Sequence, residues 1–280
     1  MAVTLDATAR QRLEALAQRR NDDLVRAIAV TTTFGGRDIL RGIDLAVRRG
    51  EVFVLMGPSG CGKTTVLRHL CGLLPPTSGS VFVDGRDLYG LDADDLDRLR
   101  LRTGLSFQGG ALLNSLSVLE NVALPMRENT QLPEAVLVQT ARTKLDMVGL
   151  LHAAHLLPAN LSGGMRKRAA IARAIALDPE IVYLDEPSAG LDPITAAEVD
   201  NVITKLNKVF KITMVVVTHD MPSALAIADR VAMMFDGKVA ALGPKQDVFG
   251  SQDPAIRNFV ERRLAESGGR GLDITQHMVI

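Results

Sequence analysis

The chain of 280 residues contains no tryptophan and only two tyrosines. Because aromatic side chains are this scarce, we do not expect a surface that stacks the bases of single-stranded nucleic acid. Its two cysteines, Cys61 and Cys71, lie in one short segment, which favours a reduced protein over a disulfide framework. Basic and acidic residues balance at 32 each, so net charge provides no general attraction to nucleic acid or anionic lipid.

Long apolar runs are also missing from the chain. Segments such as 52–56 and 214–217 are far shorter than the roughly 20 residues that cross a bilayer. The first twenty residues lack the apolar region and cleavage site of a signal peptide. We therefore expect a cytosolic chain that would serve a membrane only through a partner that crosses it.

The order of the segments predicts an α/β protein. Segments 27–34, 39–47 and 51–56 are rich in β-branched residues and are separated by turn residues, as in strands. Segments 181–184 and 212–217 are continuously apolar, as strands buried in a parallel sheet are. Helical patterns stand between the strands, which is typical of α/β folds.

We divide the chain into three parts on composition. A polar extension is expected at 1–27, one folded domain at 28–263 and a glycine-broken tail at 264–280. Within the domain, the stretch at about 109–165 lacks strand-like runs, so we expect an inserted helical subdomain there.

One loop has the pattern of a phosphate-binding site. The motif G-x-x-x-x-G-K-[ST] is matched without a gap by Gly57, Pro58, Ser59, Gly60, Cys61, Gly62, Lys63 and Thr64. Glycines allow the backbone amides to approach phosphate oxygens, and the helix N-terminus that follows favours an anion. Lys63 is expected to reach the terminal phosphates of ATP, and Thr64 to hold Mg²⁺. Thr65 completes the expected ATP-binding set. We interpret Cys61 as a small filler, because no histidine lies near it in sequence.

Two acids follow the apolar segment 181–184. Ligands bind at the carboxyl ends of strands in open α/β sheets, so Asp185 is expected to hold Mg²⁺. Side chains alternate along a strand, so Glu186 points elsewhere and is placed to polarise an attacking water. An ordinary strand end is the other interpretation of this pair, and the loop at 57–64 argues against it.

The order of GPSGCGKTT, Gln108, LSGGM, LDEP, SAGLD and His219 resembles the ATP-binding cassette (ABC) ATPases over residues 28–263. The resemblance implies a P-loop NTPase with a RecA-like core, an N-terminal antiparallel β subdomain and an inserted α-helical subdomain. It further implies that Ser162, Gly163 and Gly164 bind the γ-phosphate held by a second copy of the chain. Two complete sites would then need two copies, head to tail.

The same resemblance assigns roles to single residues. Phe34 matches the aromatic that stacks on adenine, and Gln108 matches the glutamine that senses Mg²⁺ and the γ-phosphate. Asp192 matches the aspartate that contacts the other subunit, and His219 matches the histidine on the γ-phosphate. A core phenylalanine, a surface glutamine and a structural histidine are the plainer interpretations of Phe34, Gln108 and His219.

The helix that follows LSGG departs from expectation in two ways. Met165 stands where many family members have glutamine. Arg166, Lys167 and Arg168 put three bases in a first helical turn, where they oppose the helix macrodipole. We interpret this unfavourable placement of positive charge as a sign that an anion binds at the start of the helix. A solvated basic helix end is the alternative.

A narrower resemblance rests on FQGGALLNSLSVLENVALPMRE and on GMR after LSG. These segments are similar to the ATPases of Mla/MCE-type phospholipid transporters. That resemblance implies a permease resembling MlaE, an MCE-domain protein resembling MlaD and, as an optional member, a STAS-domain protein resembling MlaB. It places the chain on the cytoplasmic face of the inner membrane.

Two other functions are alternatives to phospholipid transport. An ABC importer ATPase for a polar solute stays open. A non-transport ABC ATPase acting on nucleic acid is disfavoured, because the chain has one cassette, two cysteines and no sustained heptads between the loop at 57–64 and Ser162.

Overall fold

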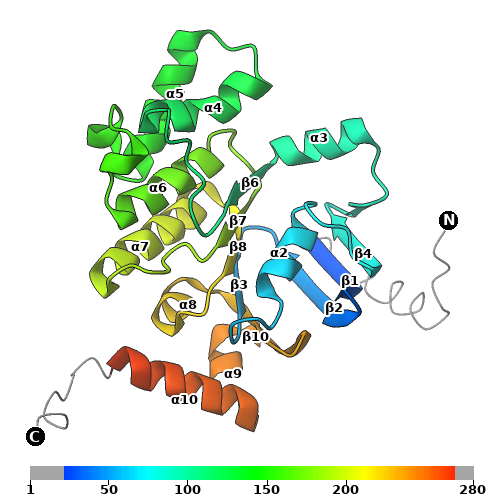
Figure 1. Ribbon diagram of the computed structural model, residues 1–280. Coiled ribbons are helices and arrows are strands. Elements are labelled where there is room, and N and C mark those ends of the chain that lie inside the picture. The colour runs from blue at the N-terminus through cyan, green and yellow to red at the C-terminus, as the bar shows by residue number, and fades with distance from the viewer. Residues whose placement is uncertain (1–21, 269–280) are drawn as a thin grey trace, which may run out of the picture.

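The computed structural model describes residues 22–268. Most of the expected extension at 1–27 and tail at 264–280 therefore lies outside the described residues. Two sheets and a group of helices make up the molecule (Figure 1). This architecture confirms the predicted α/β class with an antiparallel sheet beside a mostly parallel one.

The antiparallel sheet has the order β2-β1-β4-β5. Its strands are β1 (Asp23–Phe34), β2 (Arg37–Arg48), β4 (Ser78–Val83) and β5 (Arg86–Asp87). Gly35 and Gly36, both with positive φ, close the hairpin between β1 and β2. The first strand begins at Asp23, four residues before the strand expected at 27–34, because Asp23, Val25 and Arg26 also pair with β2.

The second sheet has the order β10-β9-β3-β8-β7-β6. All its neighbouring strands are parallel except β9 and β10, which form a hairpin through Asp236 and Gly237. The central strands β3, β7 and β8 are buried along their whole length, as their unbroken apolar sequences require. The strands are β3 (Val52–Met56), β6 (Thr103–Ser106), β7 (Ile181–Asp185), β8 (Thr213–Val217), β9 (Arg230–Phe235) and β10 (Lys238–Pro244).

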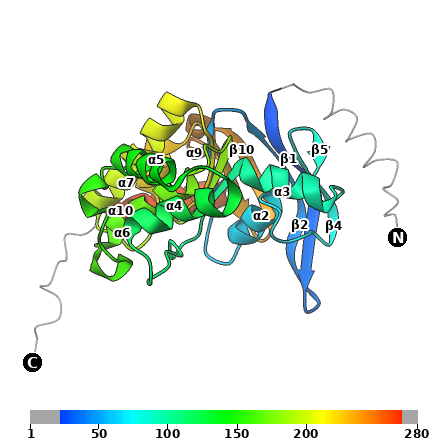
Figure 2. The ribbon, with the colours of Figure 1, turned by 90° about the horizontal axis from the view of Figure 1, so that it is seen from above.

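Side chains of β3 alternate between two hydrophobic cores. Val54 and Met56 pack in the core shared with the helices, whereas Phe53 and Leu55 pack in the core shared with the antiparallel sheet. Because successive side chains of a strand point to opposite faces, one central sheet separates these two layers. Figure 2 shows the antiparallel sheet and helices α4 to α7 gathered at opposite ends of the molecule.

No strand lies between Ser106 and Ile181 in the described chain. Helix α4 starts with a capping box, in which the side chains of Ser117 and Glu120 each bond the other's backbone. In the region that the structure describes, no helix has both the length and the apolarity to cross a bilayer. The helices are α2 (Lys63–Leu70), α3 (Ala93–Leu101), α4 (Val118–Asn129), α5 (Glu134–Met147), α6 (Gly163–Ala174), α7 (Pro193–Phe210), α8 (Met221–Ile227), α9 (Lys245–Phe249) and α10 (Pro254–Gly268), with short 3₁₀ turns at Leu151–Ala153 and Pro158–Asn160.

Candidate functional site

Four parallel strands end at one edge of the central sheet, and a predicted functional segment follows each of them. The phosphate loop (residues 57–64) follows β3, and Glu186 follows β7. His219 comes two residues after β8, and Gln108 comes two residues after β6. Parallel pairing thus brings segments that are far apart in sequence to the edge where α/β sheets bind ligands.

Close packing explains why glycine occupies positions 57 and 62 of the phosphate loop. Gly57 has a φ of 149°, and a Cβ there would lie 2.2 Å from the backbone oxygen of Met234. Gly62 has a φ of 102°, and a Cβ there would lie 2.6 Å from Cδ2 of Leu40. Any larger residue would strain the backbone and push the loop away from β9 or β2. The contact with Leu40 also places the β1–β2 hairpin beside the loop.

Lys63 is folded back over the phosphate loop. Its Nζ donates hydrogen bonds of 2.9 Å to the backbone oxygens of Gly57 and of Pro58. The side chain is almost fully buried, and helix α2 begins at this residue. A cation and a helix N-terminus therefore converge on the loop, as anion binding requires.

The other loop residues differ in exposure. Ser59 and Gly60 are exposed, and Thr65 is half-buried on α2. Burial raises the pKa of the Cys61 thiol, which keeps it protonated and unreactive at neutral pH. This environment supports the interpretation of Cys61 as a filler.

Thr64 and Asp185 bring two oxygen ligands together. The Thr64 hydroxyl donates to Oδ1 of Asp185 over 3.3 Å, and the carboxylate is buried at the end of β7. Burial raises the pKa of Asp185, and the hydrogen bond from Thr64 acts in the opposite direction. A cation beside the carboxylate would offset that cost of burial.

Glu186 faces His219 rather than Asp185. Its Oε1 lies 2.7 Å from Nδ1 of His219, and its Oε2 lies 3.5 Å from the hydroxyl of Thr218. The residue has a φ of 51°, which turns the chain out of the strand, and its N–H donates to the Val217 oxygen over 2.8 Å. The expected divergence of the two acids is therefore present, and the contact with His219 is a feature that sequence spacing did not reveal.

The signature segment (residues 161–165) begins helix α6. Ser162 is exposed and caps the helix, because its Oγ accepts a 3.2 Å hydrogen bond from the N–H of Met165. Gly164 is buried, and a Cβ there would lie 2.2 Å from Cγ2 of Thr195 on α7. A Cβ on Gly163 would lie 3.0 Å from Cδ2 of Leu191. Besides their expected ligand role, these glycines let α6 pack tightly against the start of α7.

The three bases after this segment do not behave as either interpretation expected. Arg166 donates to the oxygen of Leu161, and Arg168 donates to the oxygen of Val148. Lys167 donates to two other backbone oxygens. The positive charges are thus neither held free for an anion nor simply solvated, because main-chain carbonyls accept their hydrogen bonds. Met165, at the atypical position, packs partly buried against the hydrophobic core.

Gln108 lies in a turn that we call the Q-loop (residues 107–111). Its side chain is exposed and makes no hydrogen bond within the described residues, so the structure does not bring this amide onto Thr64 or Asp185. Arg173 of α6 holds the end of the loop, donating to the oxygens of Gly110 and Ala111. Both of those residues have positive φ.

Asp192 and Phe34 are the two remaining residues of the predicted site. Asp192 caps α7, accepting from the N–H groups of Ile194 and Thr195 and from the Thr195 hydroxyl. These bonds lower the pKa of its carboxyl. Phe34 is 48% exposed at the end of β1, which excludes a fully buried core phenylalanine and leaves part of the side chain open to solvent.

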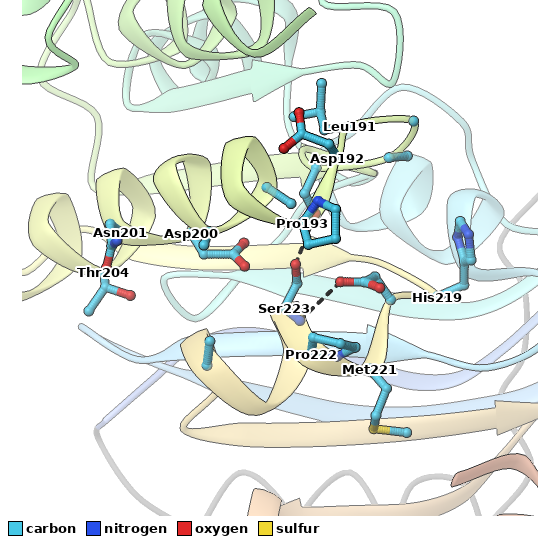
Figure 3. Close-up of a pocket in the computed structure, with 17 residues that line it drawn as sticks. Leu191, Asp192, Pro193, Asp200, Asn201, Thr204, His219, Met221, Pro222 and Ser223 are labelled. Carbon is cyan, nitrogen blue, oxygen red and sulfur yellow. Dashed lines mark hydrogen bonds between the residues drawn. The ribbon is translucent and has the colours of Figure 1, made fainter. Parts of the chain in front are cut away.

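Between α7 and α8 lies a pocket of about 810 Å³ (Figure 3). His219 lines its edge, but none of residues 57–65 does, so this pocket is not the phosphate site. Asp200 lies in its wall and is buried, with Oδ1 unpaired within the described residues. Burial raises the pKa of Asp200 to about 6.

The fold and these strand ends define a nucleotide-binding cassette of the ABC type. The family model described as ABC transporter matches residues 40–189, and the chain belongs to that family. The intermembrane phospholipid transport system ATP-binding protein MlaF of Escherichia coli K12 is 44% identical over 239 residues, covering 85% of this chain and 89% of that protein.

Two further comparisons agree with this family. A protein of Mycobacterium tuberculosis described as a probable ribonucleotide transport ATP-binding protein is 38% identical, covering 85% of this chain and 67% of that protein. Among solved structures, a dimeric ATP-binding cassette in a post-hydrolysis state, bound to ADP and Pi, matches with a TM-score of 0.72 and 34% identity. That match covers 79% of this chain and 98% of the other.

Proposed function

We propose that this chain is the ATP-binding and ATP-hydrolysing subunit of a transporter that moves phospholipid between the inner and outer membrane through a separate permease. The observation that carries the proposal is the 44% identity to MlaF over nearly its whole length. The likeness to a cassette bound to ADP and Pi supports hydrolysis of ATP.

In this proposal Lys63 and the amides of the phosphate loop bind the terminal phosphates of ATP. Nucleotide would replace the two carbonyl oxygens that Lys63 now contacts. Glu186 orients the attacking water, and His219 stabilises charge on the γ-phosphate. Ser162 and Gly164 of a second copy close the site, an arrangement that the dimeric cassette supports. Catalysis then consists mainly of positioning and electrostatics.

The oxygens of Thr64 and Asp185 fit Mg²⁺. Two protein oxygens at one point suit this ion, which takes most of its remaining ligands from water and substrate phosphates. No cluster of three or more potential ligands from His, Cys, Asp or Glu occurs within residues 22–268, consistent with a cation that arrives with the nucleotide. When bound, Mg²⁺ neutralises charge on the phosphates. Gln108 would reach this ion only if the Q-loop moves.

The proposed assembly contains two copies of the chain, a permease resembling MlaE and an MCE-domain protein resembling MlaD, with a STAS-domain protein resembling MlaB as an optional member. The chain would sit on the cytoplasmic face of the inner membrane. An importer ATPase for a polar solute is the second candidate, and the mycobacterial relative described for ribonucleotide transport favours it. The lower identity and coverage of that relative make phospholipid the better proposal.

Purification of the tagged full-length chain from its native membrane tests this function. We expect a permease and an MCE-domain protein to accompany it, and mass spectrometry to find phospholipid in the complex. ATPase activity should require the chain and should disappear in Lys63→Met. A complex that instead carries a soluble solute-binding protein, and whose ATPase responds to a polar solute, would replace the proposal with the importer.

A further inference from the structure

Lys167 is a half-buried lysine on α6, five residues after Ser162. Its Nζ donates to the backbone oxygen of Gln108 and, over 2.8 Å, to the backbone oxygen of Glu186. One ammonium group therefore joins the Q-loop, the residue after β7 and the helix of the signature segment. The adjacent arginines contact other groups: Arg166 donates to the oxygen of Leu161, and Arg168 donates to the oxygen of Val148 and pairs with Glu198 over 3.6 Å.

Both sides of Glu186 are fixed by these contacts. Its N–H donates to Val217 of β8, and its carbonyl accepts from Lys167. The left-handed backbone of a residue with a Cβ is strained, so surrounding contacts must maintain it. Lys167 provides one of those contacts, and the carboxylate that results points at His219.

The environment of Lys167 is unusual for a lysine. Burial lowers the pKa of its ammonium group, while the nearby carboxylates of Glu186 and Asp185 act in the opposite direction. Its two hydrogen bonds nevertheless go to main-chain oxygens rather than to either carboxylate. A flexible ammonium can satisfy two carbonyls that converge from different loops, which a neutral apolar side chain cannot.

We propose that Lys167 is a positioning residue that holds the backbones of Glu186 and Gln108 in fixed positions relative to helix α6. The role rests on the proposed ATPase function and adds a residue to it. Because Ser162 caps the N-terminus of α6, the lysine ties the segment that faces the other copy's nucleotide to the glutamate that serves the chain's own nucleotide. Movement of α6 is thereby passed to Glu186 through one side chain.

The test compares steady-state ATP hydrolysis and nucleotide affinity in full-length variants. For Lys167→Met, a small displacement of Glu186 should lower kcat about 10-fold or more. The affinity for ATP should change less than about 3-fold, because the hydrogen bonds of Lys167 go to Gln108 and Glu186 and not to the phosphate loop. Lys167→Arg, which keeps two donors, should recover most of kcat. Lys208→Met, the same change at an exposed lysine of α7, should leave both quantities unchanged.

A double-mutant cycle separates positioning from general damage. If Lys167 acts through Glu186, Lys167→Met should lower the residual single-turnover rate of Glu186→Gln less than about 2-fold, because residues that act as a unit are not additive. Full kcat in Lys167→Met would overturn the proposal, and so would an effect that multiplies undiminished in the Glu186→Gln background. If Lys167→Met does not fold, the cycle is run with Lys167→Gln, with the same criteria.

Failure of the proposed ATPase function would give a different result from failure of the role of Lys167. A wild-type chain that hydrolyses no ATP, alone or with its permease, would remove the proposed function and this role with it. A wild-type chain that is active and slowed by Glu186→Gln, but unaffected by Lys167→Met, would remove only the role of Lys167.

Discussion

His219 and Glu186 lie 33 residues apart in sequence, yet Nδ1 of the histidine is 2.7 Å from Oε1 of the glutamate. The two residues follow β7 and β8, which are adjacent parallel strands. The imidazole is thus oriented by the same carboxylate that we propose as the water-orienting group. This geometry makes the two side chains one unit, and in the proposed mechanism Nε2 of His219 is the atom that would contact the γ-phosphate.

Replacement of Glu186 by glutamine should slow ATP hydrolysis about 10²–10⁴-fold, the range for loss of a general base. ATP affinity should persist, because the phosphate loop is unchanged. His219→Ala should also slow hydrolysis, and the double variant should be little slower than Glu186→Gln, since the two act as a unit. Phosphate release under single-turnover conditions measures all three. Wild-type kcat in Glu186→Gln would show that this residue is not the base.

Replacement of Phe34 by alanine should raise the KM for ATP about 5- to 30-fold, from loss of about 1–2 kcal/mol of stacking. Phe34→Tyr keeps the ring face and should behave like the wild type. Phe210→Ala is the matched control, because Phe210 is 49% exposed but lies at the end of α7. An unchanged KM in Phe34→Ala would contradict the adenine assignment.

Gly164→Ala should destabilise the fold by about 1–3 kcal/mol, the usual cost of overpacking. The new methyl would meet Cγ2 of Thr195, whose Cβ is the next atom at 3.7 Å. Thr195→Ser removes only Cγ2 and keeps the hydroxyl that bonds Asp192, so the double variant should regain most of the loss. Denaturant unfolding measures the free energies, and equal losses with and without Thr195→Ser would disprove the contact.

Asp200→Asn should stabilise the protein near neutral pH. Burial raises the pKa of Asp200 to about 6 in the folded state, from an ordinary value of 3.8. The folded state therefore holds a proton more tightly, so this group's contribution to stability is full below about pH 4 and is lost as pH rises through 6. Asparagine cannot ionise and avoids that loss, which amounts to at most about 3 kcal/mol above pH 7.

Thermal unfolding across pH checks this expectation. The gain in Tm from Asp200→Asn should be largest above pH 7 and should shrink as pH falls toward 4. Asp94→Asn, at an exposed carboxylate of α3, should give no such pH-dependent gain. A gain that stays constant with pH would show that ionisation of Asp200 is not its cause.

The ends of β3, β7 and β8 were predictable from sequence because a continuous apolar run precedes each of them, whereas β6, which precedes Gln108, has no such run. The apolar run before Asp185 predicts a buried strand, and the glycines around Lys63 predict a loop that binds phosphate. The hydrogen bonds of Lys167 were not predictable, since they join Gln108 and Glu186, which become neighbours only through the order of strands in the sheet. The three basic residues at the start of α6 oppose the helix macrodipole, which suggested a bound anion. In the structure, backbone carbonyl oxygens accept hydrogen bonds from all three side chains.

The account depends most directly on two copies closing around ATP. Sedimentation of purified Glu186→Gln with Mg²⁺ and ATP measures this closure, because slow hydrolysis should trap the closed state. We predict a dimer with ATP and a monomer with ADP, and a monomer in either case when Lys63→Met is added. A chain that stays monomeric and binds no ATP, even with its permease present, would contradict the central claim.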